Sequence, residues 1–504
     1  MLSSMYSHAG GAAVTLYVNT CNQKFTTPLV DGAGKKRWLL WGDPVEVLDD
    51  SETPPLVRAR GWTGRVNPAH LSPQGLLELY VIDVGQGDGL LMRTPDDRWH
   101  LVDGGESAAN IMLGKGVPNF LAWKFLRDLG MPAITLENVI LTHPDADHFG
   151  GLGTLFSRRL ERSSFIDDLS FDLSVQNFYH NGMGRFAAAP RLGAVSPGTL
   201  AAPAPVPGSR IRKNADFITQ LISSRADFSA LLDQFGDDYR SFIEHALAAV
   251  PNFQRIAAAD GWLPGYAPAP GKAAIRVLGP VVEDLAGGGQ GLRWLSSEAW
   301  TRNGHSVLLR VDYGQARILL TGDLNRAAHN LLLGYLPPAE LRADVLKTGH
   351  HGSDDFQPRF LQAVNPRVTV ISSGDNESFD HPRPRAVGMA GHSGRWSLDV
   401  KGEPSPPLVY STEIARSYEM DYAARTRVRL PDQSVETVPS YYSWLRLLKE
   451  TDFRRTSRLA IAAELIYGLV NIRTDGEWIL CATRSELTGG FNIEVIRAGE
   501  YAVE

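Results

Sequence analysis

The sequence has 504 residues, which at about 150 residues per domain allows two or three domains. Hydrophobic residues make up 43% and charged residues 21%, so a disordered, fibrous or collagen-like chain is excluded. The net charge of -6, from 50 basic and 56 acidic residues, argues against a broad basic surface that binds nucleic acid.

The two cysteines, Cys21 and Cys481, lie far apart and form no CxxC pair. Neither a disulfide framework nor a thiolate zinc site is therefore indicated, and we expect a protein of the reducing cytoplasm. The sequence supports neither a signal peptide nor a membrane span, because no run of residues has the required length and apolar character.

Short β-prone runs separated by turn residues fill the chain from about 12 to 71. The stretch WGDPVEVLDD, followed by VRARGWTGRVNPAHL, resembles the bacterial SH3-like barrels. We therefore predict a small all-β SH3-like barrel at 1–75. The resemblance implies that it binds a protein or peptide partner, the cell wall or a neighbouring domain, and the alternative is a packing module with no ligand.

The next segment, at 76–400, alternates apolar strands with helices, which is typical of an α/β domain. It opens with LELYVIDVGQGDGLLMRTP and WHLVDGG, continues with a helix at 118–129, and reaches a strand at 138–141 that runs into THPDADHFGG. Further strands are predicted at 274–278, 306–313, 316–321, 344–347 and 367–372, with a helix at 358–364. A hairpin near 469–482 predicts that the C-terminal segment 401–504 completes this domain.

An insertion at about 187–270 interrupts the α/β domain. Residues 187–210 are rich in Ala and Pro and are predicted to form an irregular loop. Apolar residues then recur at helical spacing across 216–249, which indicates one or two amphipathic helices and a candidate cap.

The motif THPDADH carries the clearest chemical signal. It places His143, Asp145, Asp147 and His148 on a short loop directly after an apolar strand, where four side chains can converge. Imidazole nitrogen and carboxylate oxygen are ligands that zinc, manganese and iron accept. The alternative is a solvated acidic turn with two incidental histidines.

Five motifs in order extend this pattern: VIDVGQGDGLLMRTP, LVDGG, THPDADHFGGL, NGHSVLLRVDYGQARILLTGDL and VLKTGHHGS. Together they resemble the metallo-β-lactamase fold, in particular the hydrolase domain of the ComEC/Rec2 competence proteins and the related phosphorylcholine esterases. The resemblance implies an α/β fold built as an αββα sandwich. It also implies metal-dependent hydrolysis with two divalent ions, zinc or manganese.

The resemblance further implies seven metal ligands in two sets that share Asp323. The first set is His143, Asp145, Asp323 and His350, and the second is Asp147, His148, Asp323 and His381. His350 and His351 are adjacent, and only the analogy favours His350 as the ligand.

Catalytic roles follow from the same resemblance. Asp147 and Asp323 are expected to hold a metal-activated hydroxide, and His351 is expected to contact the substrate phosphate. His180, in NFYHNGMG, is expected to face the substrate or to support the ligands, and the alternative is a structural histidine with no role in the site. Asp103, in LVDGG, resembles the family's buried carboxylate that orients the metal loop.

These features favour a phosphodiesterase or nuclease, with DNA or RNA as the substrate. One alternative is a hydrolase of small phosphoesters or cyclic nucleotides, with the insertion as a lid. Another, of a different class, is a binding or regulatory protein with a vestigial metal site. The presence of suitable residues at all seven ligand positions counts against it. No membrane partner is expected.

Overall fold

The computed structural model describes residues 15–19, 24–107, 116–160, 169–374, 381–412, 426–429, 435–438, 468–484 and 490–499. Cys21 and much of the predicted C-terminal segment 401–504 lie outside these residues. No helix within the described ranges has the length and apolar character needed to cross a membrane.

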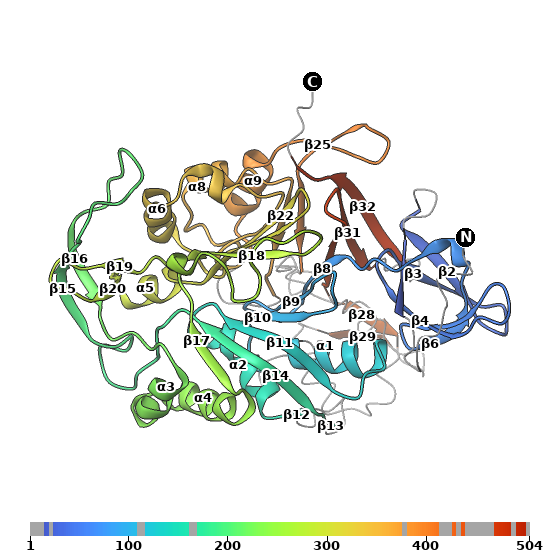
Figure 1. Cartoon of the computed structure of the whole chain (residues 1–504), viewed down its shortest axis with the longest axis horizontal. Helices are drawn as coiled ribbons and strands as arrows, with labels where there is room; N and C mark the ends of the chain where they lie inside the picture. The colour runs from blue at the N-terminus through green and yellow to red at the C-terminus, as the bar shows by residue number, and fades with distance from the viewer. Residues whose placement is uncertain are drawn as a thin grey trace.

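Two large β-sheets form the centre of the molecule (Figure 1). In the described part of the chain, nine strands make up the first sheet, in the order β17-β14-β11-β10-β9-β8-β30-β31-β32. Their bounds are β8 (Leu77–Val81), β9 (Leu90–Arg93), β10 (Trp99–Val102), β11 (Ile134–Leu141), β14 (Leu173–His180), β17 (Asn252–Arg255), β30 (Val470–Thr474), β31 (Trp478–Arg484) and β32 (Phe491–Arg497). The predicted hairpin near 469–482 corresponds to β30 and β31, next to β8.

The second sheet has six described strands, in the order β18-β21-β22-β23-β24-β27. Their bounds are β18 (Ala274–Gly279), β21 (Leu308–Tyr313), β22 (Ala316–Leu320), β23 (Val345–Lys347), β24 (Val368–Ile371) and β27 (Leu408–Ser411). The last four run parallel to one another, as do β10, β11, β14 and β17 in the first sheet. Because parallel strands end at the same edge, the loops that follow them gather there.

Helices cover the outer faces of both sheets. The nine-stranded sheet carries α1 (Val117–Leu121), continued by a π-helical segment (Ala122–Asp128), and α2 (Ala146–Phe156), α3 (Arg225–Leu231) and α4 (Asp237–Ala249). The six-stranded sheet carries α6 (Arg326–Tyr335), α7 (Pro338–Leu341), α8 (Pro358–Val364) and α9 (Pro384–Ser393), with α5 (Glu298–Gly304) beside α6. A further apolar core lies between the sheets. The fold is the predicted αββα sandwich, and its layers are visible in Figure 1.

An antiparallel N-terminal sheet, in the order β3-β2-β6-β5-β4-β1-β7, curls around its own small apolar core. Its strands are β1 (Thr15–Val18), β2 (Thr26–Val30), β3 (Lys36–Leu40), β4 (Pro44–Asp49), β5 (Leu56–Ala59), β6 (Trp62–Arg65) and β7 (Leu71–Ser72). Leu40 and Trp41 pack with Leu480 and Val495 of the nine-stranded sheet, so the two sheets share an apolar contact. The assignment of this unit as an SH3-like barrel stays a prediction.

The insertion differs from its prediction in one part. The loop expected at 187–210 contains β15 (Val195–Thr199), which pairs with β16 (Asn214–Ile218) in a small sheet with β20 (Gln290–Arg293) and β19 (Glu283–Asp284). The loop prediction was wrong here because Pro197 lies on an edge strand, where its missing N–H is tolerated.

The predicted amphipathic helices of the insertion are α3 and α4. Phe242 of α4 stacks on Phe149 and Phe156 of α2, so α4 belongs to the outer helical layer of the sandwich. Short two-stranded ribbons complete the description: β12 (Arg159–Leu160) with β13 (Leu169–Ser170), β25 (Ser397–Leu398) with β26 (Pro404–Ser405), and β28 (Thr426–Arg429) with β29 (Val435–Val438).

Candidate metal centre

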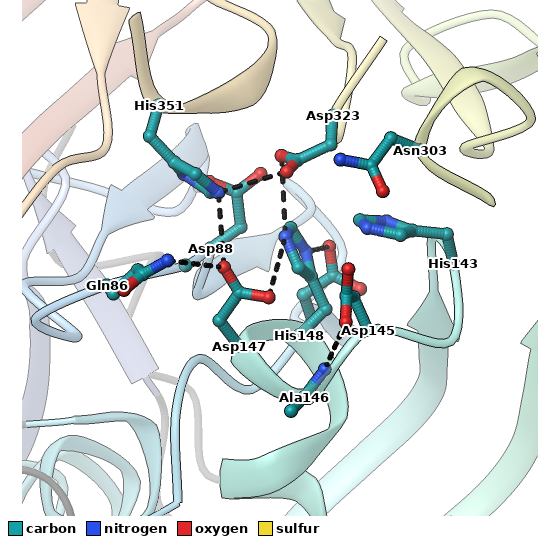
Figure 2. A network of polar contacts seen from close by, with 12 residues as sticks. Gln86, Asp88, His143, Asp145, Ala146, Asp147, His148, Asn303, Asp323 and His351 are labelled. Atoms are coloured by element: carbon teal, nitrogen blue, oxygen red, sulfur yellow. Dashed lines mark hydrogen bonds and ion pairs between the residues drawn. The ribbon is translucent and has the colours of Figure 1, made fainter. Parts of the chain in front are cut away.

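The side chains of the metal motif meet at the edge where the parallel strands end. His143 follows β11, Asp323 follows β22 and His351 follows β23, while Asp147 and His148 lie in the first turn of α2. Figure 2 shows these side chains pointing toward one another. Both sheets of the sandwich therefore contribute to one centre.

His143 is fully buried, and two hydroxyl groups hold its ring. Its Nδ1 lies 3.0 Å from Oγ1 of Thr142 and 3.2 Å from Oγ of Ser306. Thr142 donates its hydroxyl proton to Asp103 at 2.7 Å, and Ser306 donates its proton to the backbone oxygen of Asn303 at 2.7 Å. Both hydroxyl oxygens can therefore only accept from His143, so Nδ1 carries the proton and Nε2 presents its lone pair to the centre. Burial lowers the pKa of His143 well below its usual value, which keeps the ring neutral.

His148 is oriented by Asp103. Its Nδ1 donates to Oδ2 of Asp103 at 2.8 Å, and the same carboxylate accepts from the backbone N and the hydroxyl of Thr142 at 2.7 Å each. Nε2 of His148 consequently faces the centre, 3.4 Å from Oδ1 of Asp323. Burial lowers the pKa of His148, but Asp323, Asp103 and Asp147 more than offset this and raise it well above its usual value. A carboxylate behind an imidazole is the arrangement that orients metal-binding histidines.

Asp323 lies between donor side chains of the two sheets. Its Oδ2 is 3.1 Å from Nε2 of His351 and 3.9 Å from Nε2 of His350. Its backbone N donates to Oγ of Ser306 at 3.0 Å, which anchors the turn after β22. Burial raises the pKa of Asp323, but His351 and His148 together lower it by more. The net pKa therefore lies well below its usual range. The carboxylate is therefore charged and central.

Asp147 and His351 face each other across the centre. Nε2 of His351 is 3.6 Å from Oδ2 of Asp147, and the side chain of Gln86 donates to the same oxygen at 3.3 Å. Burial raises the pKa of Asp147. Burial disfavours the charged form of His351, but Asp323 and Asp88 raise its pKa to about 10. A positive charge is thus favoured between these carboxylates.

The structure brings His351, rather than His350, into this group. Both residues have left-handed backbone, with φ of 52° and 48°, in the 3-10 turn His350–Gly352. His351 is 1% exposed, and its Nδ1 lies 3.2 Å from the backbone oxygen of Ser372. The side chain of His350 is 31% exposed. The structure thus places His351 deeper than His350, although Nδ1 of His350 is also buried without a hydrogen-bond partner. The expectation that His350 is the metal ligand stays a prediction.

Four buried atoms in this group that could bind a metal ion have no hydrogen-bond partner. They are Nε2 of His143, Nε2 of His148, Nε2 of His351 and Oδ1 of Asp323. Among the described residues, the donors of His143, His148 and Asp323 lie within 4.8 Å of one another, and so do those of Asp147, His148 and His351. Two further sets include Asp88, which is already paired with Lys347. Nitrogen and carboxylate donors at this spacing fit zinc or manganese.

Asp145 is not a member of these donor sets. It is the N-cap of α2, and its side chain accepts a hydrogen bond from the backbone N of Ala146 at 3.0 Å. Its Oδ2 pairs with Arg302 at 2.9 Å and its Oδ1 pairs with Arg185 at 3.4 Å. Both carboxylate oxygens thus contact groups of the protein, and the expected role of Asp145 as a metal ligand stays a prediction.

Two other predicted histidines also lie outside the donor sets. His381 is buried beside His350, with ring centres 5.7 Å apart, and its burial lowers its pKa to about 4. His180, at the end of β14, packs edge-on against Phe228, and its Nδ1 accepts from the backbone N of Gly182 at 3.1 Å. Burial lowers the pKa of His180 to about 3. His381 therefore borders the centre. His180 has a hydrogen-bond partner at Nδ1, while its Nε2 is buried without one.

Sequence reasoning did not single out Lys347, Thr142 or Arg302. Lys347 ends an apolar strand, and a lysine at a buried position is rare unless it is paired, so this signal could have identified it. Thr142 and Arg302 carry no comparable signal, because their contacts with Asp103 and Asp145 depend on the tertiary fold.

Comparisons with known proteins agree with this fold. Residues 82–159 match the model of the Metallo-beta-lactamase superfamily. ComE operon protein 3 of Bacillus subtilis is 33% identical over 88 residues, Competence protein ComA of Neisseria gonorrhoeae 42% over 81 residues, and Recombination protein 2 of Haemophilus influenzae 38% over 73 residues. These matches cover 17%, 16% and 14% of this chain and only 11%, 12% and 9% of the respective relatives.

Two solved structures were also matched. The metallo-beta-lactamase fold protein YhfI from Bacillus subtilis gives a TM-score of 0.30 at 11% identity, covering 67% of this chain and 98% of that one. Zn(2+)-bound PqqB from Methylobacterium extorquens gives a TM-score of 0.22 at 14% identity, covering 52% and 59%. Because both scores are low, the assignment of the metallo-β-lactamase fold depends on the superfamily match and on the αββα layers.

Proposed function

We propose that this chain, which carries a metallo-β-lactamase superfamily domain, is a metal-dependent phosphodiesterase. The observation that carries the proposal is the set of four buried donor atoms without partners, contributed by both sheets and directed into one small volume. Each unsatisfied buried polar atom costs about 1–3 kcal/mol, so this arrangement is expensive unless an ion binds there. The donor chemistry favours two divalent ions, zinc or manganese.

Metal ions bound here would supply hydroxide near neutral pH and neutralise charge on a phosphoryl oxygen. The three buried histidines of the centre would bind through Nε2, because each Nδ1 faces a protein group. Asp323 is placed to contact donors of both sheets. Asp147 is the most exposed of the carboxylates in the donor sets, at 19%, so it lies on the side that a substrate reaches.

Two arginines beside the centre favour an anionic substrate. Arg302 lies 2.9 Å from Asp145 and its side chain is 16% exposed, while Arg185 lies 3.4 Å from the same carboxylate and is 32% exposed. One carboxylate therefore faces two guanidinium groups, which leaves a local excess of positive charge. Guanidinium groups bind phosphate oxygens well, so a phosphodiester is a suitable partner.

Nucleic acid is the substrate class that we favour. The matched relatives include a competence protein and a recombination protein, and this similarity supports a DNA or RNA strand as substrate. The net charge of -6 specifically favours the second candidate, a small diester or cyclic nucleotide, because it argues against a broad basic surface.

Digestion of a substrate panel tests the proposal. Purified protein with added manganese or zinc is incubated with single-stranded DNA, duplex DNA, RNA, a cyclic dinucleotide and bis(p-nitrophenyl) phosphate. We expect hydrolysis by the wild type and none by Asp147→Ala. A matched control is Asp344→Asn, which removes a buried carboxylate paired with Arg367 at the other end of β23.

The outcomes separate the candidates. Cleavage of polynucleotides supports the nuclease assignment, whereas cleavage of small diesters alone supports the second candidate. Full activity in excess chelator would overturn the metal-dependent mechanism. Failure of the metal-loaded wild type to hydrolyse any diester would favour a binding or regulatory protein.

A further inference from the structure

A glycine-rich turn between β8 and β9, residues 85–89, carries a fully buried carboxylate. Asp88 is 0% exposed, and its Oδ2 accepts a hydrogen bond from Nζ of Lys347, which is 1% exposed. Its Oδ1 has no aligned hydrogen-bond partner and lies 3.4 Å from Nδ1 of His351. One oxygen of Asp88 thus binds a lysine, and the other faces a histidine of the candidate metal centre.

Lys347 connects this carboxylate to a second part of the centre. It is the last residue of β23, and its Nζ also donates to the backbone oxygen of Gly322 at 3.2 Å. Gly322 directly precedes Asp323, the central carboxylate. A single buried cation therefore joins Asp88 to the turn that presents Asp323.

The same glycine-rich turn makes further contacts behind the centre. The backbone oxygen of Gly87 accepts from Oγ of Ser372 at 2.9 Å, and the backbone oxygen of Ser372 lies 3.2 Å from Nδ1 of His351. Gln86 donates to Oδ2 of Asp147 at 3.3 Å. Residues 85–89 therefore contact, directly or through one further residue, the segments that carry Asp147, His351 and Asp323.

A buried ion pair contributes little net stability, because the cost of removing both charges from water can exceed their mutual attraction. Replacing such a pair by well-packed apolar side chains is often neutral, or stabilising by about 1–4 kcal/mol. A buried carboxylate behind a metal-binding imidazole has a different use, because it fixes the ring orientation and the nitrogen that faces the metal. The position of the Asp88–Lys347 pair, directly behind His351 and Asp323, matches this second use.

We propose that Asp88 and Lys347 are positioning residues that hold His351 and Asp323 in the orientation needed to bind metal. The inference rests on the metal binding of the proposed function but not on the identity of the substrate. The charge of Asp88 and the hydrogen bond to the backbone oxygen of Ser372 together hold Nδ1 of His351 toward the protein, so that Nε2 faces the centre. Lys347 neutralises Asp88 and fixes the turn before Asp323.

Cobalt binding to the full chain tests this proposal without an activity assay. Metal-free wild type, Asp88→Asn and the double variant Asp88→Leu/Lys347→Met are titrated with Co²⁺, and the visible spectrum and chelator competition report ligand geometry and affinity. The double variant removes both charges together, so it leaves no unpaired buried ion and is expected to fold. Asp344→Asn is the matched control, because it disrupts a buried ion pair away from the centre.

We expect both Asp88 variants to bind Co²⁺ about 10–100-fold more weakly, with an altered visible spectrum, as is usual when a supporting residue of a metal site is lost. The control should lose unfolding free energy but keep the wild-type spectrum and affinity. A folded double variant with the wild-type spectrum and affinity would overturn the proposal. A wild type that binds no Co²⁺ would instead overturn the proposed function itself, and this inference with it.

Discussion

Among the described residues, two of the buried clusters of charged side chains differ in how their polar atoms are satisfied. The first is the candidate metal centre. The second, the junction cluster, consists of Asp43, Arg60, Glu78 and Arg473, where the N-terminal sheet meets the nine-stranded sheet. Arg473 lies 2.9 Å from Asp43 and 3.7 Å from Glu78, and Arg60 lies 2.5 Å from Asp43. None of these four side chains has a buried polar atom without a hydrogen-bond partner.

The metal centre, unlike the junction cluster, contains buried polar atoms without hydrogen-bond partners. Its histidines and carboxylates approach one another at 3.1–4.0 Å, yet four of its buried donor atoms have no hydrogen-bond partner. Burial alone therefore does not distinguish a functional cluster from a structural one. The distinguishing feature is a set of buried nitrogen and carboxylate oxygen atoms that lie close together and have no hydrogen-bond partner. The junction cluster should govern stability, whereas the metal centre should govern activity.

The largest expected effect is that of Asp323→Asn. It removes the central charge of the metal centre, so metal binding and hydrolysis should fall by about 10³-fold or more, since a bound metal supplies several kcal/mol of transition-state stabilisation. Metal content by mass spectrometry and diester hydrolysis measure this. The free energy of unfolding in chelator should also fall, because His148 and His351 lose the carboxylate that stabilises their charged forms. A fully active Asp323→Asn protein would show that activity does not depend on the metal centre.

Arg473→Leu should have the converse effect. It leaves Asp43 and Glu78 as buried carboxylates with fewer partners, so the free energy of unfolding should fall by about 3–5 kcal/mol. Urea denaturation monitored by circular dichroism measures this loss. The variant that remains folded should retain wild-type metal content and turnover. A stable Arg473→Leu protein with lost metal binding would show that the two clusters are not separate.

Gly87→Ala should act on the metal centre through the backbone. Gly87 has φ of 105°, and a Cβ there would overlap the backbone oxygen of Asp147. We expect hydrolysis to fall about 10–100-fold as Asp147 is displaced, as for other lost supports of a metal site. Gly85→Ala is the control, because Gly85 also has positive φ, at 70°, but a Cβ there meets no neighbouring atom. Equal losses in the two variants would assign the effect to backbone strain alone.

Arg302→Met should raise the KM for an anionic diester about 10-fold, because one charge-assisted hydrogen bond is worth about 1.5 kcal/mol or more. Metal content should not change. Arg240→Met is the control, since Arg240 is an exposed arginine of α4 paired with Glu244. If the turnover number fell while KM stayed constant, Arg302 would support the ligands rather than bind substrate.

His351 of the metal centre and Asp43 of the junction cluster should respond to opposite ends of the pH scale, as gradual trends. The pKa of His351 is raised to about 10 in the metal-free fold, so its stabilisation is present below about pH 6.5 and lost as pH rises toward 10. Burial raises the pKa of Asp43, but Arg60 and Arg473 lower it more, so its stabilisation is present above about pH 4 and lost in acid. Urea unfolding in chelator across pH 3–10 measures both. A His351→Gln variant with an unchanged alkaline loss would contradict the first assignment.

Much of this fold follows from local patterns in the sequence. The helix predicted at 358–364 coincides with α8, and strands predicted at 316–321 and 367–372 correspond to β22 and β24 within a residue at each end. Each is a short apolar run bounded by Gly, Pro or Asn. The THPDADH motif also predicts the position of the candidate metal centre, because it directly follows a buried strand at the edge of the sheet where the parallel strands end.

The remaining features depend on the tertiary fold. Two successive left-handed residues place His351 deeper than His350, and the side-chain alternation of a strand does not apply to such residues. The position of Asp145 in the motif is the one expected for a metal ligand. In the structure, Asp145 caps α2 and pairs with two arginines. The Asp88–Lys347 pair joins residues 259 positions apart, so no local pattern contains it.

The most direct test of the central claim is diffraction from crystals grown with manganese or zinc and measured at the absorption edge of the metal. We expect anomalous peaks beside Asp323, with Nε2 of His143, His148 and His351 as ligands. Buried histidines that instead bind ordered water, with no anomalous peak within reach of Asp323, would contradict it.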